Sequence, residues 1–165
     1  MVGIIAVGFT LSHAEMKVGV INSEKIFTEY EGVKTAKEKF DKEVAVWEQQ
    51  ATQKQKDMQS LKDQIDKQSL LLSAERKKAL EDSLNQMAVQ YQKFLQDKFG
   101  QKGEALQKNE ELTKPIIEKI NKIIDQIAKD ENYDLIFDES RGGVVFAKEM
   151  YNLNPRVLEA LSKEK

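Results

Sequence analysis

The chain has 165 residues, of which 40% are hydrophobic and 33% charged, with only 8 glycines and 2 prolines. This balance is typical of extended helices, in which few residues are buried and many are solvated. The formal net charge is −2, which excludes the strongly basic surface expected of a nucleic-acid-binding protein. There is no cysteine and the single histidine is His13, so disulfides, thiolate chemistry and Cys- or His-based metal sites are excluded from residues 15–165.

The first fourteen residues resemble an export signal. Residues 2–11 are apolar or small, and Ser12 and Ala14 place small residues two apart before Glu15, as in a signal-peptide core with its cleavage site. The run is too short to span a bilayer, which takes about 20 residues. No Lys or Arg precedes it, so either the true start lies upstream of Met1 or the segment is something else, and a buried first strand is the alternative. We predict a signal peptide over residues 1–14 that is cleaved near Ala14.

A short strand and a short helix are predicted next. Residues 17–21 are apolar after Lys17 and mostly β-branched, which favours a buried strand. Asn22 and Ser23 are favourable N-cap residues, so a helix should begin there with Ile26 on its inner face. Gly32 is expected to loosen the chain after this helix.

Residues 33–129 are predicted to form a long antiparallel helical hairpin. On the outgoing helix, residues 33–68, apolar side chains recur in alternating steps of four and three, with Lys54 at one of these positions, which is a heptad seam. The seam positions are Phe40, Val44, Trp47, Ala51, Met58, Leu61 and Ile65. Because so narrow a stripe cannot fold into a compact globule, the hairpin is expected to project into water.

The return helix is expected to run from residue 74 to residue 129, with Ser73 as its N-cap. Its apolar positions are Leu80, Leu84, Met87, Tyr91, Phe94, Leu95 and Phe99, followed by Leu112, Ile116, Ile120, Ile123 and Ile127. Pro115 is a point where this helix is expected to kink or restart. Gly100 and Gly103 each cost about 1 kcal/mol of helix stability relative to Ala. They are either tolerated weak spots or a hinge in the hairpin.

The tip of the hairpin, residues 69–73, contains the consecutive leucines Leu70, Leu71 and Leu72. They are interpreted either as a plug at the end of the coiled coil or as an exposed contact for non-native apolar segments. Residues 54–78 carry seven basic and four acidic side chains. This surplus of three positive charges is either an ordinary solvated surface or a weak attraction for anionic lipid headgroups.

The C-terminal part is predicted to contain two strands and a helix. Residues 133–137 and 144–147 are the strands, joined by a turn that contains Gly142 and Gly143. A last helix begins at Asn154 and Pro155, with the asparagine as its cap.

The predicted fold class is therefore α+β and mostly α. Residues 15–32 and 110–165 form a small β-containing oligomerisation body, and residues 33–109 form a coiled-coil tentacle. A core this small is marginal alone and its strand edges need covering, so a symmetric oligomer is expected. The residues predicted to build the body are Val18, Val20, Ile21, Leu135, Ile136, Phe137, Val144 and Val145.

No catalytic, cofactor or metal site is predicted, and an enzyme is not expected. Acidic pairs such as Glu81 and Asp82 are neighbours that point different ways round a helix, so they do not converge for acid–base chemistry. Gly142 and Gly143 are not followed by the Lys-Ser/Thr pair of a phosphate-binding loop, and a turn explains them better.

Three stretches together resemble the Skp (OmpH-like) family of periplasmic chaperones. They are KVGVIN at 17–22 leading into SEKIF at 23–27, the long charged hairpin, and YDLIFD at 133–138. The resemblance covers residues 15–165 and rests on the order and patterning of the elements. It implies a jellyfish-shaped homotrimer in which the bodies assemble and three tentacles enclose a cavity.

The resemblance further implies an ATP-independent holdase that binds unfolded outer-membrane β-barrel proteins in the periplasm and delivers them to the outer membrane. Some members are strongly basic and bind lipopolysaccharide, whereas this chain is acidic overall. The candidate client contacts are Met58, Leu70, Leu71, Leu72, Phe94 and Phe99, and the candidate hinge residues are Gly100 and Gly103. The alternatives are a coiled-coil spacer or tether of the cell envelope and a prefoldin-like cytosolic chaperone.

Overall fold

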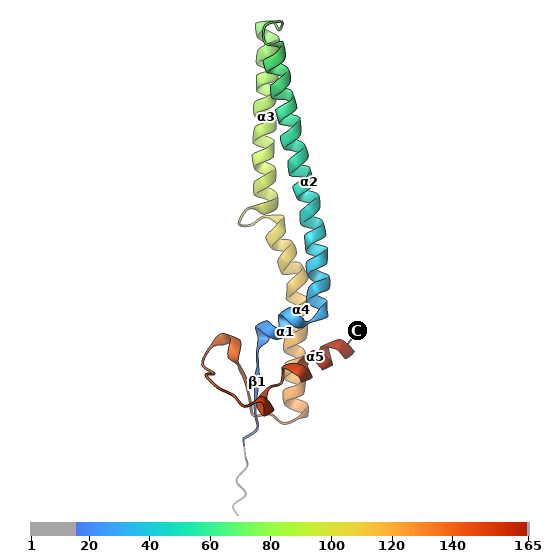
Figure 1. Cartoon of the computed structure of the whole chain (residues 1–165), viewed down its shortest axis with the longest axis vertical. Helices are drawn as coiled ribbons and strands as arrows, with labels where there is room; N and C mark the ends of the chain where they lie inside the picture. Colours follow the sequence, from blue (N-terminus) through green and yellow to red (C-terminus); the bar gives the residue numbers. More distant parts are fainter. Residues whose placement is uncertain (1–15, 165) are drawn as a thin grey trace, which may run out of the picture. The chain divides into compact units, whose positions relative to one another are not determined.

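The structure is a computed structural model that describes residues 16–164. The predicted signal peptide, residues 1–14, lies outside the described residues. The main elements are β1 (Val18–Ile21), α1 (Ser23–Glu29), α2 (Glu31–Gln68), α3 (Ala74–Phe99), α4 (Glu104–Asp130), β2 (Leu135–Asp138) and α5 (Asn154–Lys163) (Figure 1). Two short 3₁₀ helices, η1 (Glu139–Arg141) and η2 (Glu149–Tyr151), lie between β2 and α5. The predicted fold class, mostly helical with a small sheet, is confirmed.

The chain divides into two compact units. Residues 30–119 form one unit, which we call the arm. The described residues 16–29 and 120–164 form the other, which we call the body. The sequence had predicted an arm formed by residues 33–109. Helix α4 contributes to both units, since the division falls at Ile120.

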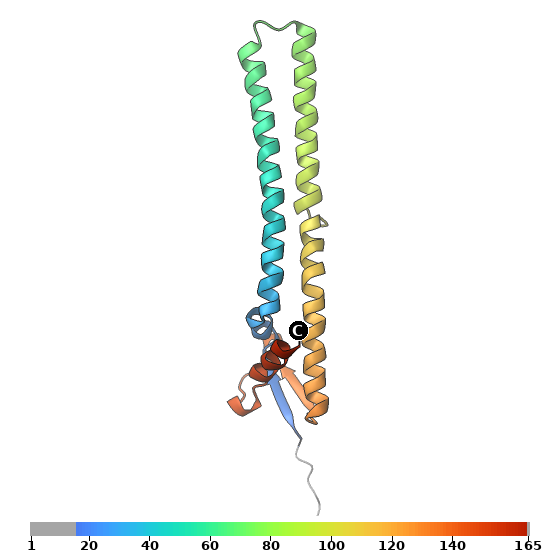
Figure 2. The ribbon, with the colours of Figure 1, turned by 90° about the vertical axis from the view of Figure 1, so that its right-hand side faces the viewer.

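In the arm, α2 and α3 run antiparallel beside each other (Figure 2). All seven apolar seam positions predicted for α2 are buried or half-buried, and so is Lys54. Only Ala36, Trp47 and Ile65 are buried on α2, and α3 has no buried residue. A two-helix pair covers each seam residue from one side only, so the arm has a stripe of contacts rather than an enclosed core.

The return helix was expected to be continuous from residue 74 to residue 129, but it is broken. Helix α3 ends at Phe99 and α4 begins at Glu104. A Cβ atom on Gly100 would lie 2.4 Å from the carbonyl oxygen of Gln96, and one on Gly103 would lie 2.7 Å from that of Lys98. Glycine is therefore what allows the chain to fold back so tightly here. The helix restarts at Glu104 and then continues through Pro115, so the restart expected at that proline is wrong.

In the body, β1 and β2 form a parallel pair with Val18 opposite Leu135 and Val20 opposite Phe137. Residues 144–147 are not a strand, so the predicted second strand is wrong. After β2 the chain enters η1 and then Gly142 and Gly143, whose φ angles of 81° and 91° lead it away instead of back along β2. The other edge of β1 is occupied by Asn152, which forms an isolated parallel bridge with Val20.

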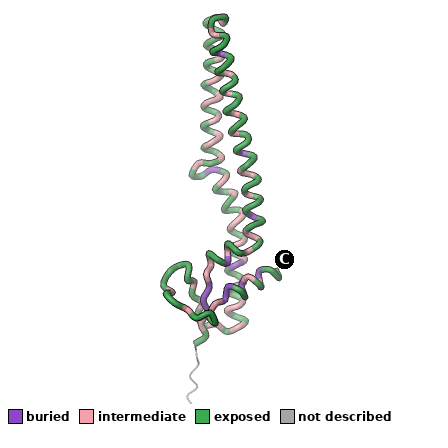
Figure 3. The backbone as a smooth tube through the Cα atoms, in the orientation of Figure 1, coloured by how far each residue is buried: buried purple, intermediate pink, exposed green. Residues whose placement is uncertain are grey.

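The core of the body lies between β1, α1 and α5. Ile26, Val157 and Leu161 are at most 1% exposed, and Leu153 is 2% exposed. A Cβ atom on Gly19 would lie 2.4 Å from Cδ1 of Leu153, so the glycine lets Leu153 pack directly against the strand. Figure 3 shows the buried residues gathered in the body and only scattered along the arm.

Candidate functional site

The sheet of the body has one open apolar face. The parallel register places Val18, Val20, Leu135 and Phe137 on the same face. Leu135 is 46% exposed and Phe137 is 47% exposed. This face borders an open groove of about 750 Å³, which is also lined by Met16, Val145, Phe146 and Tyr151. A sheet with one apolar face open to water is incomplete as a fold and is suited to contact another protein surface.

The segment after β2 enlarges this surface. Val145 is fully exposed, and Phe146 and Met150 are 81% and 76% exposed. The sequence did not predict Phe146, Met150 or Met16 as part of this surface. Phe146 was missed because residues 144–147 were assigned to a strand of the body. Phe146 lies in an apolar run that follows the glycine pair, whereas Met16 and Met150 stand beside charged residues and have no signal in the sequence.

The residues predicted to build the oligomerisation body divide into two groups. Val20 and Ile21 are buried within the body, and Val18, Ile136 and Val144 are half-buried. Leu135, Phe137 and Val145 are exposed. The second group is therefore available to a partner, whereas the first mainly shapes the body itself.

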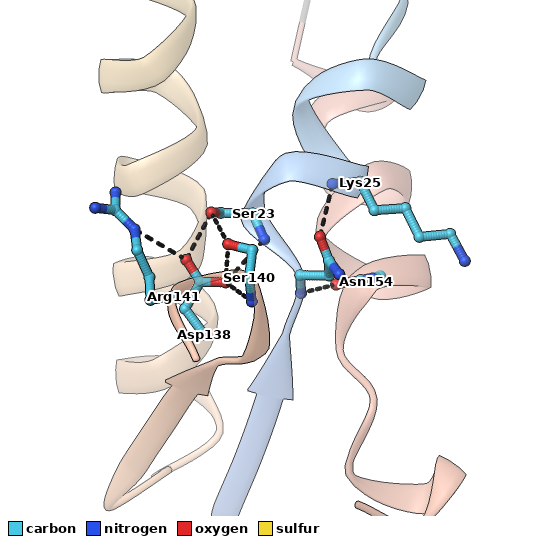
Figure 4. A network of polar contacts seen from close by, with 7 residues as sticks. Ser23, Lys25, Asp138, Ser140, Arg141 and Asn154 are labelled. Carbon is cyan, nitrogen blue, oxygen red and sulfur yellow. Dashed lines mark hydrogen bonds and ion pairs between the residues drawn. The ribbon is translucent and has the colours of Figure 1, made fainter. Parts of the chain in front are cut away.

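A polar cluster around Asp138 fixes the edge of the same sheet (Figure 4). The backbone N–H and hydroxyl of Ser23 donate to its carboxylate over 3.1 and 2.6 Å, and those of Ser140 over 3.1 and 2.7 Å. Burial disfavours the charged form of Asp138, but these hydrogen bonds outweigh it and lower the pKa from 3.8 to about 2. The cluster therefore ties the start of α1 to the end of β2.

Two asparagines complete this polar frame. Asn22 Oδ1 accepts from the backbone N–H of Lys25 over 2.8 Å, which confirms Asn22 as the cap of α1. The backbone N–H of Asn22 donates to Asn154 Oδ1 over 2.8 Å. Asn154 was expected to cap α5, but it is the first residue of that helix, and its side chain joins α5 to α1 instead. Of these two asparagines the sequence thus predicted the cap of α1 correctly and the cap of α5 wrongly, and it did not reveal the bond between Asn22 and Asn154.

The tip of the arm carries two exposed apolar side chains. Leu70 is 97% exposed and Leu71 is 87% exposed, whereas Leu72 is half-buried. The plug interpretation therefore fits Leu72 alone. Ser73 caps α3, as predicted, by accepting from the backbone N–H of Arg76 over 3.2 Å. The cap thus fixes the start of α3 directly after the exposed leucines.

The seam of the arm contains two lysines over aromatic rings. Lys54 Nζ lies 5.4 Å from the ring centre of Phe94, and Lys98 Nζ lies 5.1 Å from that of Trp47. Trp47 also meets Phe99 edge to face, with ring centres 6.2 Å apart. Of the predicted client contacts, Met58 and Phe94 lie half-buried in the seam, while Phe99 is 39% exposed. Gly100 and Gly103 both lie in the break between α3 and α4.

With this geometry established, comparison with known proteins places the chain. The model of the family described as outer membrane protein (OmpH-like) matches residues 17–161. The chain belongs to the OmpH-like family. The resemblance to the Skp (OmpH-like) proteins seen in the sequence is thereby confirmed.

A solved structure shows the same fold for an OmpH-like protein of Caulobacter crescentus CB15, which was named as a candidate outer membrane chaperone. The two share 13% sequence identity with a TM-score of 0.83, and the match covers 98% of this chain and 92% of the other. No curated protein matches the sequence.

Two further findings concern residues 16–164 of this OmpH-like protein. Within that range no group of three or more His, Cys, Asp or Glu side chains could hold a metal ion. No helix in the described part of the chain is both long enough and apolar enough to cross a membrane.

Proposed function

We propose that this OmpH-like protein is an ATP-independent holdase that binds unfolded outer-membrane β-barrel proteins in the periplasm and keeps them soluble for delivery to the outer membrane. The observation that carries the proposal is the family match across residues 17–161, which includes both the arm and the body. The proposed function needs neither catalysis nor a cofactor.

The arm has the physical properties that such a role needs. Barrel strands alternate apolar and polar side chains, so an unfolded barrel protein must be kept from water and from other strands. Exposed apolar residues at the tip and near the break, namely Leu70, Leu71 and Phe99, offer weak contacts. Several weak contacts made at once give an affinity that no single contact has. The arm can therefore hold a client without folding it.

We further propose that the protein acts as a homotrimer, and the open face of the body supports this proposal. The open face with Leu135, Phe137 and Val145 is too apolar to remain in water, and another copy of the same chain would cover it. Three arms joined in this way would enclose a client. The number three comes from the family resemblance.

Assembly can be tested with a matched pair of valines. Val145 is fully exposed and Val89, on the arm, is 69% exposed, so aspartate at either position leaves the fold of the single chain intact. We expect Val145→Asp to sediment as a monomer and Val89→Asp to sediment like the wild type. An unchanged assembly in Val145→Asp would contradict the proposed interface.

Chaperone activity can be tested by diluting a urea-unfolded outer-membrane β-barrel protein into buffer with or without the purified protein. We expect the purified protein to suppress light scattering, and suppression to be lost in Val145→Asp. An intact trimer that does not suppress aggregation would favour the envelope spacer instead.

The tip supports a weaker additional proposal, contact with an anionic membrane surface or with lipopolysaccharide. Exposed Leu70 and Leu71 lie between Lys67 and Arg76, and apolar side chains flanked by basic ones suit an anionic interface. Co-sedimentation with vesicles containing an anionic lipid, compared with neutral vesicles, tests this contact.

A further inference from the structure

The break between α3 and α4 interrupts only one of the two helices of the arm. Helix α2 continues without interruption past this level, where its residue Trp47 is 6% exposed. The return side leaves its helix at Gly100 and resumes it at Glu104. Any change in the angle between α3 and α4 must therefore occur at residues 99–103, because α2 remains a continuous helix beside them.

The return side also contains spare residues at this level. Trp47 and Glu43 are four residues apart on α2, whereas the lysines that contact them, Lys98 and Lys108, are ten residues apart. Four residues span about 6 Å of helix and ten would span about 15 Å. The difference is taken up by the loop at residues 100–103, which leaves the helical path (Figure 1). The return side thus has more residues at this level than a straight helix beside α2 would need, and the loop holds the surplus.

Lys98 joins the two sides of this break. Its ammonium group forms an ion pair with Glu104 at the start of α4, and it lies over the ring of Trp47 on α2. The Lys98 side chain is only 19% exposed, because it occupies a seam position four residues after Phe94, where an apolar residue is usual. A charge at such a position is tolerated when it is paired, so this lysine is held by its two partners.

We propose that Lys98 is a latch that holds the break closed, and that its release lets α3 and α4 move independently about residues 99–103. Three parts of the arm meet in the latch: α3 through Lys98, α4 through Glu104 and α2 through Trp47. The ion pair is partly open to water, since Glu104 is 50% exposed, so the latch is weak enough to open reversibly. If the proposed function holds, opening the latch widens the range of client sizes that the arms accept.

The latch can be tested on the whole protein with Lys98→Met, which keeps an apolar stem in the seam and removes the ammonium. Trp47 is the only tryptophan of the chain, so its fluorescence reports the latch directly. We expect a change in Trp47 emission and about tenfold faster hydrogen exchange of the backbone amides at residues 100–105, which corresponds to about 1.4 kcal/mol. Lys98→Arg keeps a cation that can lie over the Trp47 ring and pair with Glu104, so hydrogen exchange at residues 100–105 should stay as slow as in the wild type.

Lys93→Met is the matched control, because it removes an exposed ion pair with Asp97 on the same helix. Equal exchange at residues 100–105 in Lys98→Met and Lys93→Met would overturn the latch. So would faster exchange spread evenly over α2 and α3, because that would report general unfolding of the arm. These readouts need no client. The latch and the holdase can therefore fail separately: a protein that captures no client refutes the proposed function, whatever Trp47 reports.

Discussion

The arm and the body of this protein are stabilised in opposite ways. In the arm, α2 and α3 meet along a repeating seam in which nearly every contact residue keeps part of its surface in water. In the body, a few side chains are almost completely buried, and hydrogen bonds join residues more than 100 positions apart, such as Lys17 with Asp134 and Asn22 with Asn154. The comparison indicates that stability is distributed evenly along the arm and concentrated at a few positions in the body.

The largest difference is expected from shortening one isoleucine in each unit. Ile26 in the body is 0% exposed and Ile65 in the arm is 6% exposed. Ile26→Ala should lower the free energy of unfolding by about 4 kcal/mol, because the rigid core cannot close the cavity. Ile65→Ala should cost about 2 kcal/mol, because helices in a pair can shift to fill the gap. Urea unfolding at one fixed protein concentration measures both, and equal losses would contradict the comparison.

A smaller effect is expected at the polar cluster of the body. Asp138→Asn replaces an acceptor by an amide that cannot accept all of the bonds from Ser23 and Ser140, which should cost about 1 kcal/mol at neutral pH. The control is Asp97→Asn in the arm, which removes an exposed ion pair with Lys93 and should cost under about 0.5 kcal/mol.

The pH dependence of stability gives a second test of Asp138. The folded-state pKa of about 2 lies below the ordinary value of 3.8, so its contribution is complete above about pH 4 and is lost as the pH falls through about 2. The contribution is about 1 kcal/mol after screening by solvent, since the side chain is 20% exposed. Thermal melts between pH 5 and pH 2 should therefore converge for the wild type and Asp138→Asn. A constant difference over that range would show that the charge of Asp138 is not the cause.

The smallest effect is expected in the seam of the arm. Lys54→Met removes a charge from a half-buried position and leaves an apolar chain against Phe94. The lost cation–π contact and the gained burial are similar in size, so stability should change by less than about 0.5 kcal/mol. Urea unfolding would show this. A loss above about 2 kcal/mol would mean that the charge contributes to the stability of the arm as strongly as a core residue.

The seam could be predicted from the sequence because a heptad repeat is a local pattern. The break could not be placed, because no local pattern in residues 99–104 marks where one helix ends and the next begins. Only the two glycines indicated a weakness there, and they were equally consistent with a continuous helix. The two contacts of Lys98, with Glu104 and Trp47, join three helices and have no local signature.

The body was predicted less well, for a different reason. Val145 and Phe146 are apolar and β-branched or aromatic, which favours a strand, yet they are exposed in the single chain. Composition shows that such residues avoid water, but it does not show whether their own chain or another one covers them. The Asp138 cluster joins Ser23 to residues 115 positions later, and no spacing in the sequence reveals so distant a contact.

The parallel pairing of β1 with β2 has a consequence for the order in which the molecule forms. The first strand begins at Val18 and its partner ends at Asp138, so the sheet must wait until most of the chain has been synthesised. The two arm helices can zip together earlier and draw Tyr30 and Lys119 close, where the lysine Nζ lies 5.8 Å from the tyrosine ring centre. Pairing of the two arm helices thereby removes most of the entropy cost of closing the long loop between β1 and β2. A polypeptide released before residue 135 should accordingly contain a folded hairpin and no sheet.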